Sequence, residues 1–260
     1  MRDLLAQLHT DQPADPMGAA RANMRPDLPR RFYDKVAVGE HDGGFAVELD
    51  GRPARTPGKA IVALGTAPAA RIVADEFGAQ EETIDPSTMP AFRLVNTAID
   101  GVAADPQAVH EDIVRFFGSD LVCYRAEGPE TLVALQRDSW DGPLEWAERQ
   151  AGGRFHLAEG VIHVAQPRET LRAMAALVAQ VTDPVALAAL HSMTTLTGSA
   201  VLAYGVYRAA WGADDAWAAA HVDEDFNIAQ WGEDAQARAV RQRRRREMDA
   251  AARMIDALRT

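Results

Sequence analysis

The sequence predicts an α+β protein, in which a small antiparallel β-containing N-terminal domain is followed by a helical-bundle C-terminal domain. Residues 32–64 alternate apolar and polar positions around two turn signals, which is typical of short antiparallel strands. From residue 66 onward, apolar residues recur mostly at helical spacing between capping residues and prolines. The expected parts are an N-terminal arm over 1–30, the β-containing domain over 31–155 and the helical domain over 156–260.

The composition indicates an ordinary globular protein and excludes several classes. The 260 residues are 47% hydrophobic and 25% charged, and the net charge of −11 argues against general binding to nucleic acid or anionic membranes. Cys123 is the only cysteine, so no disulfide framework is possible, which suits a reducing, cytoplasmic location. The most apolar run, 196–211, is shorter than the roughly 20 residues of a membrane span, so no membrane insertion is expected.

The N-terminal third is expected to contain a short helix, an extended arm and a meander of four strands. Asp50-Gly51 marks one hairpin turn, and Pro53 favours an edge position for the strand that follows. The apolar run 121–124 could join this sheet. Apolar and polar residues alternate over 155–164, although weakly, which suggests another strand there. The expected ranges are a helix over 2–9 and strands over 35–38, 45–49, 52–56 and 59–64.

The remaining chain predicts helices, several of which begin at a capping residue. Thr66 and Asp105 stand directly before apolar-periodic segments, and each has a proline in the first turn that follows. The longest helix spans about 40 Å and carries a flank of small residues, which predicts a place at the centre of the bundle. The expected helices are 66–77, 90–102, 106–117, 129–151 with a break or kink at 141–143, 168–181, 184–210, 213–230 and 234–258.

Sequence motifs for an active site or a cofactor are lacking. No glycine-rich nucleotide loop occurs, and the histidines are scattered without metal-ligand spacing, so we expect no cofactor, no metal and no small-molecule substrate. Ser199 is expected to be a packing residue inside the long helix, and Cys123 an inert core thiol. The arginine-rich segment 238–246 is typical of an exposed terminal helix with interspersed acids, rather than of a nucleic-acid site.

The segment 222–234 combines five acidic residues with two large aromatic residues, and it leaves two interpretations open. Phe226 and Trp231 could anchor a helix in the core and leave a solvated acidic back, or they could belong to a surface that holds another protein. The helical spacing alone favours the first interpretation. As an alternative function, an enzyme could use the Asp223, Glu224 and Glu233 carboxylates for acid–base chemistry if one were buried.

Several long motifs resemble the assembly chaperones of the F-type ATP synthase, in the branch that handles the alpha subunit of the catalytic head. The likeness covers residues 31–246. Asn227 departs from it, since the family usually has glutamine there, and Phe77 stands where tryptophan is frequent. The motifs are RFYDKV at 31–36, LDGRPARTP at 49–57, RLVNTAID at 93–100, DLVCYRA at 120–126, LTGS at 196–199, DEDFNI at 223–228 and QWGED at 230–234.

This resemblance implies a protein that is not an enzyme. A member of that family holds the free alpha subunit until the beta subunit replaces it, and so prevents aggregation of the alpha subunit. The resemblance implies that the acidic segment before Trp-Gly is the functionally important part of the chain. In this segment we expect Phe226 and Trp231 to anchor the helix and the acidic residues to face the partner. Carried over by position, the expected protein-binding residues are Asp223, Glu224, Phe226, Asn227, Trp231 and Glu233.

Overall fold

The computed structural model describes residues 28–160 and 162–259. Its internal contacts divide the chain into two compact units, one containing the segment up to Phe32 together with Gln80–Asp85, and the other containing Tyr33–Ala79 and the chain from Pro86 onward. The helix expected over 2–9 and most of the expected arm lie outside the described residues. The domain boundary expected between residues 155 and 156 stays a prediction.

The smaller unit consists of two short segments paired as an antiparallel bridge. Arg30 lies opposite Thr83, and the backbone N–H of Ile84 donates to the carbonyl of Pro29 at 2.8 Å. The backbone N–H of Arg31 donates to the carbonyl of Glu82 at 2.9 Å. Backbone pairing therefore joins segments that lie about fifty residues apart in the sequence.

The larger unit begins with the predicted antiparallel sheet. Its central strand is β2, which pairs with β1 on one side and with both short strands, β3 and β4, on the other. Asp50 and Gly51 form the expected hairpin turn, and both have positive φ angles, 51° and 75°, as such a turn requires. The strands are β1 (Val36–His41), β2 (Gly44–Leu49), β3 (Arg52–Pro53) and β4 (Ala63–Leu64).

Helix α3 (Ala67–Gly78) packs against β1 and β2 and begins at its predicted cap, because the Thr66 hydroxyl accepts the N–H of Ala69 at 3.3 Å. Asp105 likewise caps α5 (Pro106–Phe117). Between them lie a 3₁₀ turn (Pro86–Thr88), α4 (Pro90–Thr97) and a π-helical turn (Ala98–Val102). The predicted helix starts at 66 and 105 are therefore confirmed.

The next segment differs from the prediction in two ways. Helix α6 (Glu130–Ala151) runs without interruption past Pro143, because Trp140, Leu144 and Ala147 are buried on both sides of that proline. The run 121–124 does not join the four-stranded sheet. The backbone N–H of Cys123 donates to the carbonyl of Asp120, which folds the run into a 3₁₀ turn (Leu121–Cys123), and the following β5 (Tyr124–Arg125) pairs in parallel with β6 (Ala158–Glu159).

The long central helix predicted over 184–210 is two helices, α8 (Pro184–Thr197) and α9 (Ala200–Tyr207). Gly198 has a φ of 68° and ends α8, and the Ser199 hydroxyl then caps α9 by accepting the N–H of Leu202 at 3.0 Å. Ser199 is therefore a capping residue, and its expected place inside a helix was wrong. The predicted central position is confirmed, since most residues of α8 and nearly all residues of α9 are buried.

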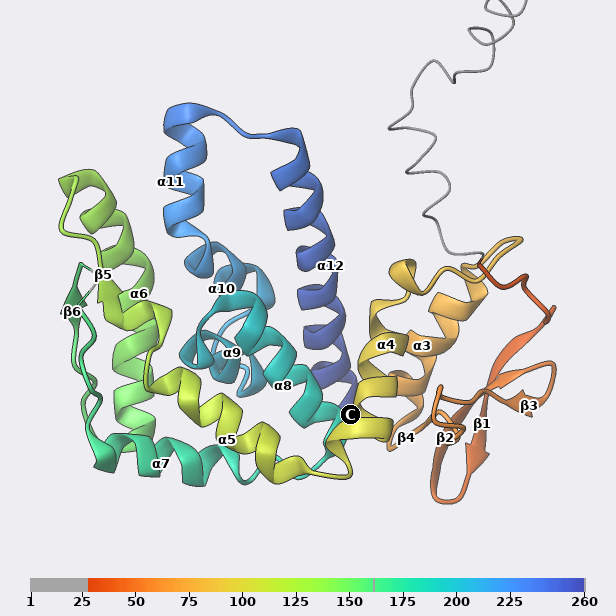
Figure 1. The fold of residues 1–260 in the computed structure, drawn as a ribbon. Coiled ribbons are helices and arrows are strands. Elements are labelled where there is room, and N and C mark those ends of the chain that lie inside the picture. The colour runs from red at the N-terminus through yellow and green to blue at the C-terminus, as the bar shows by residue number, and fades with distance from the viewer. Residues whose placement is uncertain (1–27, 161, 260) are drawn as a thin grey trace, which may run out of the picture. The chain divides into compact units, whose positions relative to one another are not determined.

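The C-terminal helices surround this pair. Helix α7 (Arg168–Val178) packs against α5 and α6, and α12 (Ala235–Leu258) packs along α8 as well as against α3 and α4. The single helix predicted over 213–230 is split at His221 into α10 (Ala213–Ala220) and α11 (Val222–Trp231), and Figure 1 shows α11 beside the first turns of α12. The α+β prediction is confirmed. None of the described helices combines the length and apolar character that a membrane crossing needs.

Candidate functional site

The acidic–aromatic segment forms α11 and the turn after it. Three carboxylates, those of Asp223, Glu224 and Asp225, occupy the first helical turn, where the N-terminal end of the helix dipole favours negative charge. The helix ends at Gly232, whose φ of 85° is unfavourable for other residues. Helix α11 is only ten residues long and contains no buried residue. Its position therefore depends on side-chain links to α6 and α12.

Asp223 is held by a buried glutamine of α6. The Gln136 amide donates from Nε2 to Oδ1 of Asp223 at 2.7 Å, and its Oε1 accepts the backbone N–H of Ala126 at 2.8 Å. Gln136 is only 2% exposed, so both hydrogen bonds satisfy polar atoms that have little access to water. The carboxylate of Asp223 thus has a fixed position relative to α6.

The neighbouring acids are held by arginines of α12. Nη1 of Arg241 lies 2.5 Å from Oδ1 of Asp225, and its Nε lies 4.0 Å from Oε2 of Glu224. The hydrogen bond with Asp225 raises the pKa of Arg241 above its usual value. Glu233, in the turn after α11, pairs with Arg238 at 2.8 Å. The acidic segment therefore faces arginines of its own chain.

The two aromatic residues do not anchor α11 as expected. Trp231 is 87% exposed, Phe226 is half-buried, and no residue of α11 is fully buried. The inner position belongs to Trp217 of α10, which is 6% exposed and stacks on the His221 ring with 3.9 Å between the ring centroids. The segment is helical, as its spacing predicts, but no neighbouring element of the described chain covers the surface that carries Trp231.

His221 forms the hinge between α10 and α11. Its Nδ1–H donates to the Trp217 carbonyl at 2.8 Å, and its Nε2 lies 3.8 Å from Oε2 of Glu224. Burial lowers the pKa of His221 because the charged ring would lose its hydration. The neutral ring therefore serves mainly to stack on Trp217 and to fix the direction of α11.

The structure brings most of the predicted site residues together and adds three that the sequence reasoning missed. Asp223, Glu224 and Glu233 take part in the links described, while the Asn227 side chain is exposed. The missed residues are Gln136, Trp217 and Arg241. Only Gln136 carried a usable signal, because it precedes the buried positions 140, 144 and 147 at helical spacing, where a glutamine is unusual. Among the described residues, no group of three histidine, cysteine or acidic side chains is placed to hold a metal ion.

Comparisons with known proteins agree with this structure. The family model described as "ATP12 chaperone protein" matches residues 30–148. The solved structure of the Atu1473 protein of Agrobacterium tumefaciens is 48% identical, covers 99% of this chain and 97% of its own, and superposes with a TM-score of 0.86. The chain belongs to the ATP12 chaperone family. A second relative, Atp12 from Paracoccus denitrificans, is 38% identical over 88% of this chain and 98% of its own, with a TM-score of 0.82.

An aspartate-to-lysine variant of the same Paracoccus protein gives the same identity, coverage and TM-score. Membership of the ATP12 chaperone family confirms the resemblance found in the sequence. It also extends beyond the residues that the family model matches, because the solved relatives cover the helical part that contains α11 and α12. The acidic segment, its arginine partners and the exposed Trp231 therefore belong to a chaperone fold.

Proposed function

We propose that this ATP12-family protein is an assembly chaperone of the F-type ATP synthase. It binds the free alpha subunit, shields the subunit from aggregation, and releases it when the beta subunit arrives. The observation that carries the proposal is Trp231, which is 87% exposed at the end of a helix rich in carboxylates. A large exposed aromatic residue next to charged groups is typical of an anchor in a protein–protein interface.

The proposed binding residues are Asp223, Glu224, Phe226, Asn227, Trp231 and Glu233. The carboxylates of Glu224 and Glu233 already face Arg241 and Arg238, so a client must offer basic groups that compete with those arginines. Both ion pairs are only partly exposed. Exchange between them and a client should still cost little free energy, because an ion pair near the surface contributes about 0–1 kcal/mol. Binding of this kind is specific enough to select a client and weak enough to be reversed.

Release requires no catalysis. A partner that binds the client more tightly removes it from the chaperone by mass action, and the difference in affinity supplies the free energy. The acid–base alternative gains no support from the described residues, since Asp223 is held by Gln136 and Glu233 by Arg238. We therefore propose that the carboxylates act through binding alone.

The test is co-expression with the alpha subunit of the F-type ATP synthase, with the fraction of soluble alpha subunit as the readout. Wild type should keep the alpha subunit soluble, and purified beta subunit should then displace the chaperone from the complex. Trp231→Ala should reduce that protection. Leu157→Ala is the matched control, because Leu157 is a large hydrophobic residue that is 51% exposed outside α11 and α12. If wild type gives no protection, or if beta subunit leaves the complex intact, the proposal is wrong.

A further inference from the structure

One face of α12 lines two neighbouring cavities. The larger has a volume of about 970 Å³ and the smaller about 570 Å³, and both are bordered by Arg245 and Arg246. The α12 residues that border either cavity recur every three or four positions from Arg238 to Asp256, which is one face of a helix. At 1.5 Å per residue this face is about 27 Å long. We call it the α12 groove.

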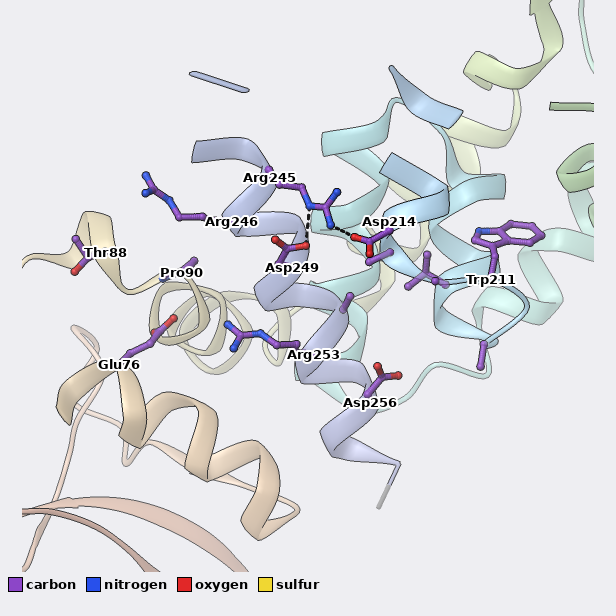
Figure 2. Close-up of a pocket in the computed structure, with 15 residues that line it drawn as sticks. Glu76, Thr88, Pro90, Trp211, Asp214, Arg245, Arg246, Asp249, Arg253 and Asp256 are labelled. Carbon is purple, nitrogen blue, oxygen red and sulfur yellow. Dashed lines mark hydrogen bonds and ion pairs between the residues drawn. The ribbon is translucent and has the colours of Figure 1, made fainter. Parts of the chain in front are cut away.

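The larger cavity combines charged residues with apolar ones. Pro90, Val206 and Trp211 contribute apolar surface from α4, α9 and the segment after α9. Figure 2 shows Arg246 and Arg253 extending from α12 toward the side of Pro90 and Glu76, while Asp214 and Trp211 lie on the other side of α12. A ligand here would meet cationic groups on one side of α12 and an aromatic ring on the other.

The acids that border the larger cavity already have partners. Arg245 pairs with both Asp214 and Asp249, and Asp256 pairs with Arg259. The two oxygens of Glu76 accept the backbone N–H groups of Ala91 and Phe92, each at 2.8 Å. These carboxylates are therefore occupied by groups of the chain itself.

Two arginines that border the larger cavity, in contrast to its acids, have side chains without a partner in the described chain. Within the described part of the chain, neither the Arg246 nor the Arg253 side chain makes a hydrogen bond or an ion pair, and both residues are exposed. Arg253 acts on Glu76 only at longer range, where its positive charge lowers the pKa that burial raises. The larger cavity is lined by four acids and three arginines, and within the described chain the arginines among them that lack an ion-pair partner are Arg246 and Arg253.

We propose that the α12 groove binds an acidic segment of the client polypeptide, whose carboxylates pair with Arg246 and Arg253. The proposal rests on the proposed chaperone function and names the chemistry of one client segment. The two arginines lie seven residues apart, about 10 Å along α12, which matches carboxylates two turns apart on a helix. The length of the groove, together with Trp211 and Trp217 beside it, fits an amphipathic peptide better than a small anion.

The variant that tests the groove is Arg246→Glu/Arg253→Glu. Both side chains are exposed and make no hydrogen bond or ion pair within the described chain, so the charge reversal should leave the fold intact, which the melting temperature checks. The matched control is Arg172→Glu/Arg243→Glu, which makes the same change in net charge at two exposed arginines that border neither cavity. If the first variant fails to fold, Arg246→Gln/Arg253→Gln replaces it.

The first arm uses synthetic peptides and full-length protein. The first peptide is an 18-residue amphipathic helix, about as long as the α12 groove, with Glu at two positions seven residues apart and leucines on the opposite face. The second peptide has the same sequence with Lys in place of each Glu. Wild type and the control variant should bind the Glu peptide equally, and the groove variant should bind it about tenfold more weakly. Rising salt should weaken the wild-type complex. If wild type prefers the Lys peptide or neither, or if both variants bind alike, the proposal is overturned.

The second arm uses the purified alpha subunit with the same three proteins. If the alpha subunit binds wild type and the control about tenfold more tightly than the groove variant, the groove is a client site. If all three bind the alpha subunit equally, the groove proposal is overturned while the chaperone function stands. If none of them binds the alpha subunit, the proposed function fails, and the peptide arm still decides whether the groove takes an acidic segment.

Discussion

The carboxylate of Asp120 accepts the backbone N–H of Val201 at 2.9 Å, and so connects the turn before β5 to the first turn of α9. Its other oxygen accepts the N–H of Val122 at 3.2 Å. The side chain is fully buried, and burial raises its pKa to about 6, although hydrogen bonds from Ser199 and the backbone oppose that rise. A single buried carboxylate thus holds together two segments that lie 81 residues apart.

Asp120 should make stability depend on pH in the mildly acidic range. Because the folded-state pKa of about 6 exceeds the ordinary value of 3.8, the folded protein holds this proton more tightly than the unfolded chain. The contribution is complete below about pH 4 and is lost as the pH rises to about 6, with a total of about 3 kcal/mol. Urea unfolding at several pH values measures this slope.

The control for that slope is Asp120→Asn, which cannot titrate. It should show a flatter dependence than wild type between about pH 4 and pH 6. It should also be less stable than wild type at neutral pH by about 1–3 kcal/mol, because one backbone N–H then faces an amide NH₂ instead of an acceptor. An identical slope in the two proteins would show that Asp120 titrates at its ordinary pKa.

Gln136→Ala should destabilise the protein and free α11 from α6. The substitution removes the acceptor of the Ala126 N–H and the donor to Asp223, in a position that is 2% exposed. A loss of about 1–3 kcal/mol is expected. Arg137→Ala is the control, because Arg137 is exposed on the same helix and should change stability by less than about 0.5 kcal/mol. Equal effects of the two changes on the free energy of unfolding would contradict a structural role for the Gln136 amide.

Local signals in the sequence predicted most of the helices and strands. The features that were not predicted depend on contacts between residues far apart in the sequence. Thr66 and Asp105 cap their helices through hydrogen bonds to residues three positions later, so sequence alone located both helix starts. The break at Gly198 was hidden because α8 and α9 are buried on nearly all sides and show no apolar periodicity to interrupt.

The candidate site was predictable only in part, for a related reason. Periodicity shows which residues share a helix face but does not show whether another element covers that face, so Trp231 was wrongly expected to anchor α11. Gln136 and Asp223 lie 87 residues apart, and their hydrogen bond follows from the packing of α6 on α11. The family resemblance identified the acidic segment without indicating that arginines of α12 hold it.

Two glycines should respond to the same substitution in opposite directions. A Cβ at Gly205 would collide with the indole ring of Trp211, so Gly205→Ala should displace that ring and cost about 1–3 kcal/mol. Gly78 is the exposed last residue of α3 and has open space around it, so Gly78→Ala should stabilise that helix by about 0.5–1 kcal/mol. Thermal unfolding compares the two, and tryptophan fluorescence reports the ring. If Gly205→Ala is as stable as wild type, the close packing of Trp211 on α9 is wrong.

Trp217→Ala and Trp231→Ala should separate the anchoring of the site from its proposed contact with the client. Trp217 is 6% exposed beneath Arg245 and beside His221, so its removal should cost about 3–5 kcal/mol. Trp231 is 87% exposed, and its removal should change the free energy of unfolding by less than about 0.5 kcal/mol. Denaturant unfolding measures both effects, and the solubility of co-expressed alpha subunit measures protection.

The combination of the two readouts distinguishes a binding residue from a structural one. With Trp231→Ala, stability should be retained while protection falls, because the indole contributes to an interface and not to the core. With Trp217→Ala, any loss of protection should follow the loss of folded protein, and conditions that restore folding should restore it. A Trp231→Ala protein that is markedly unstable would place this residue in the core after all, and one that protects the alpha subunit as well as wild type would move the client contact away from α11.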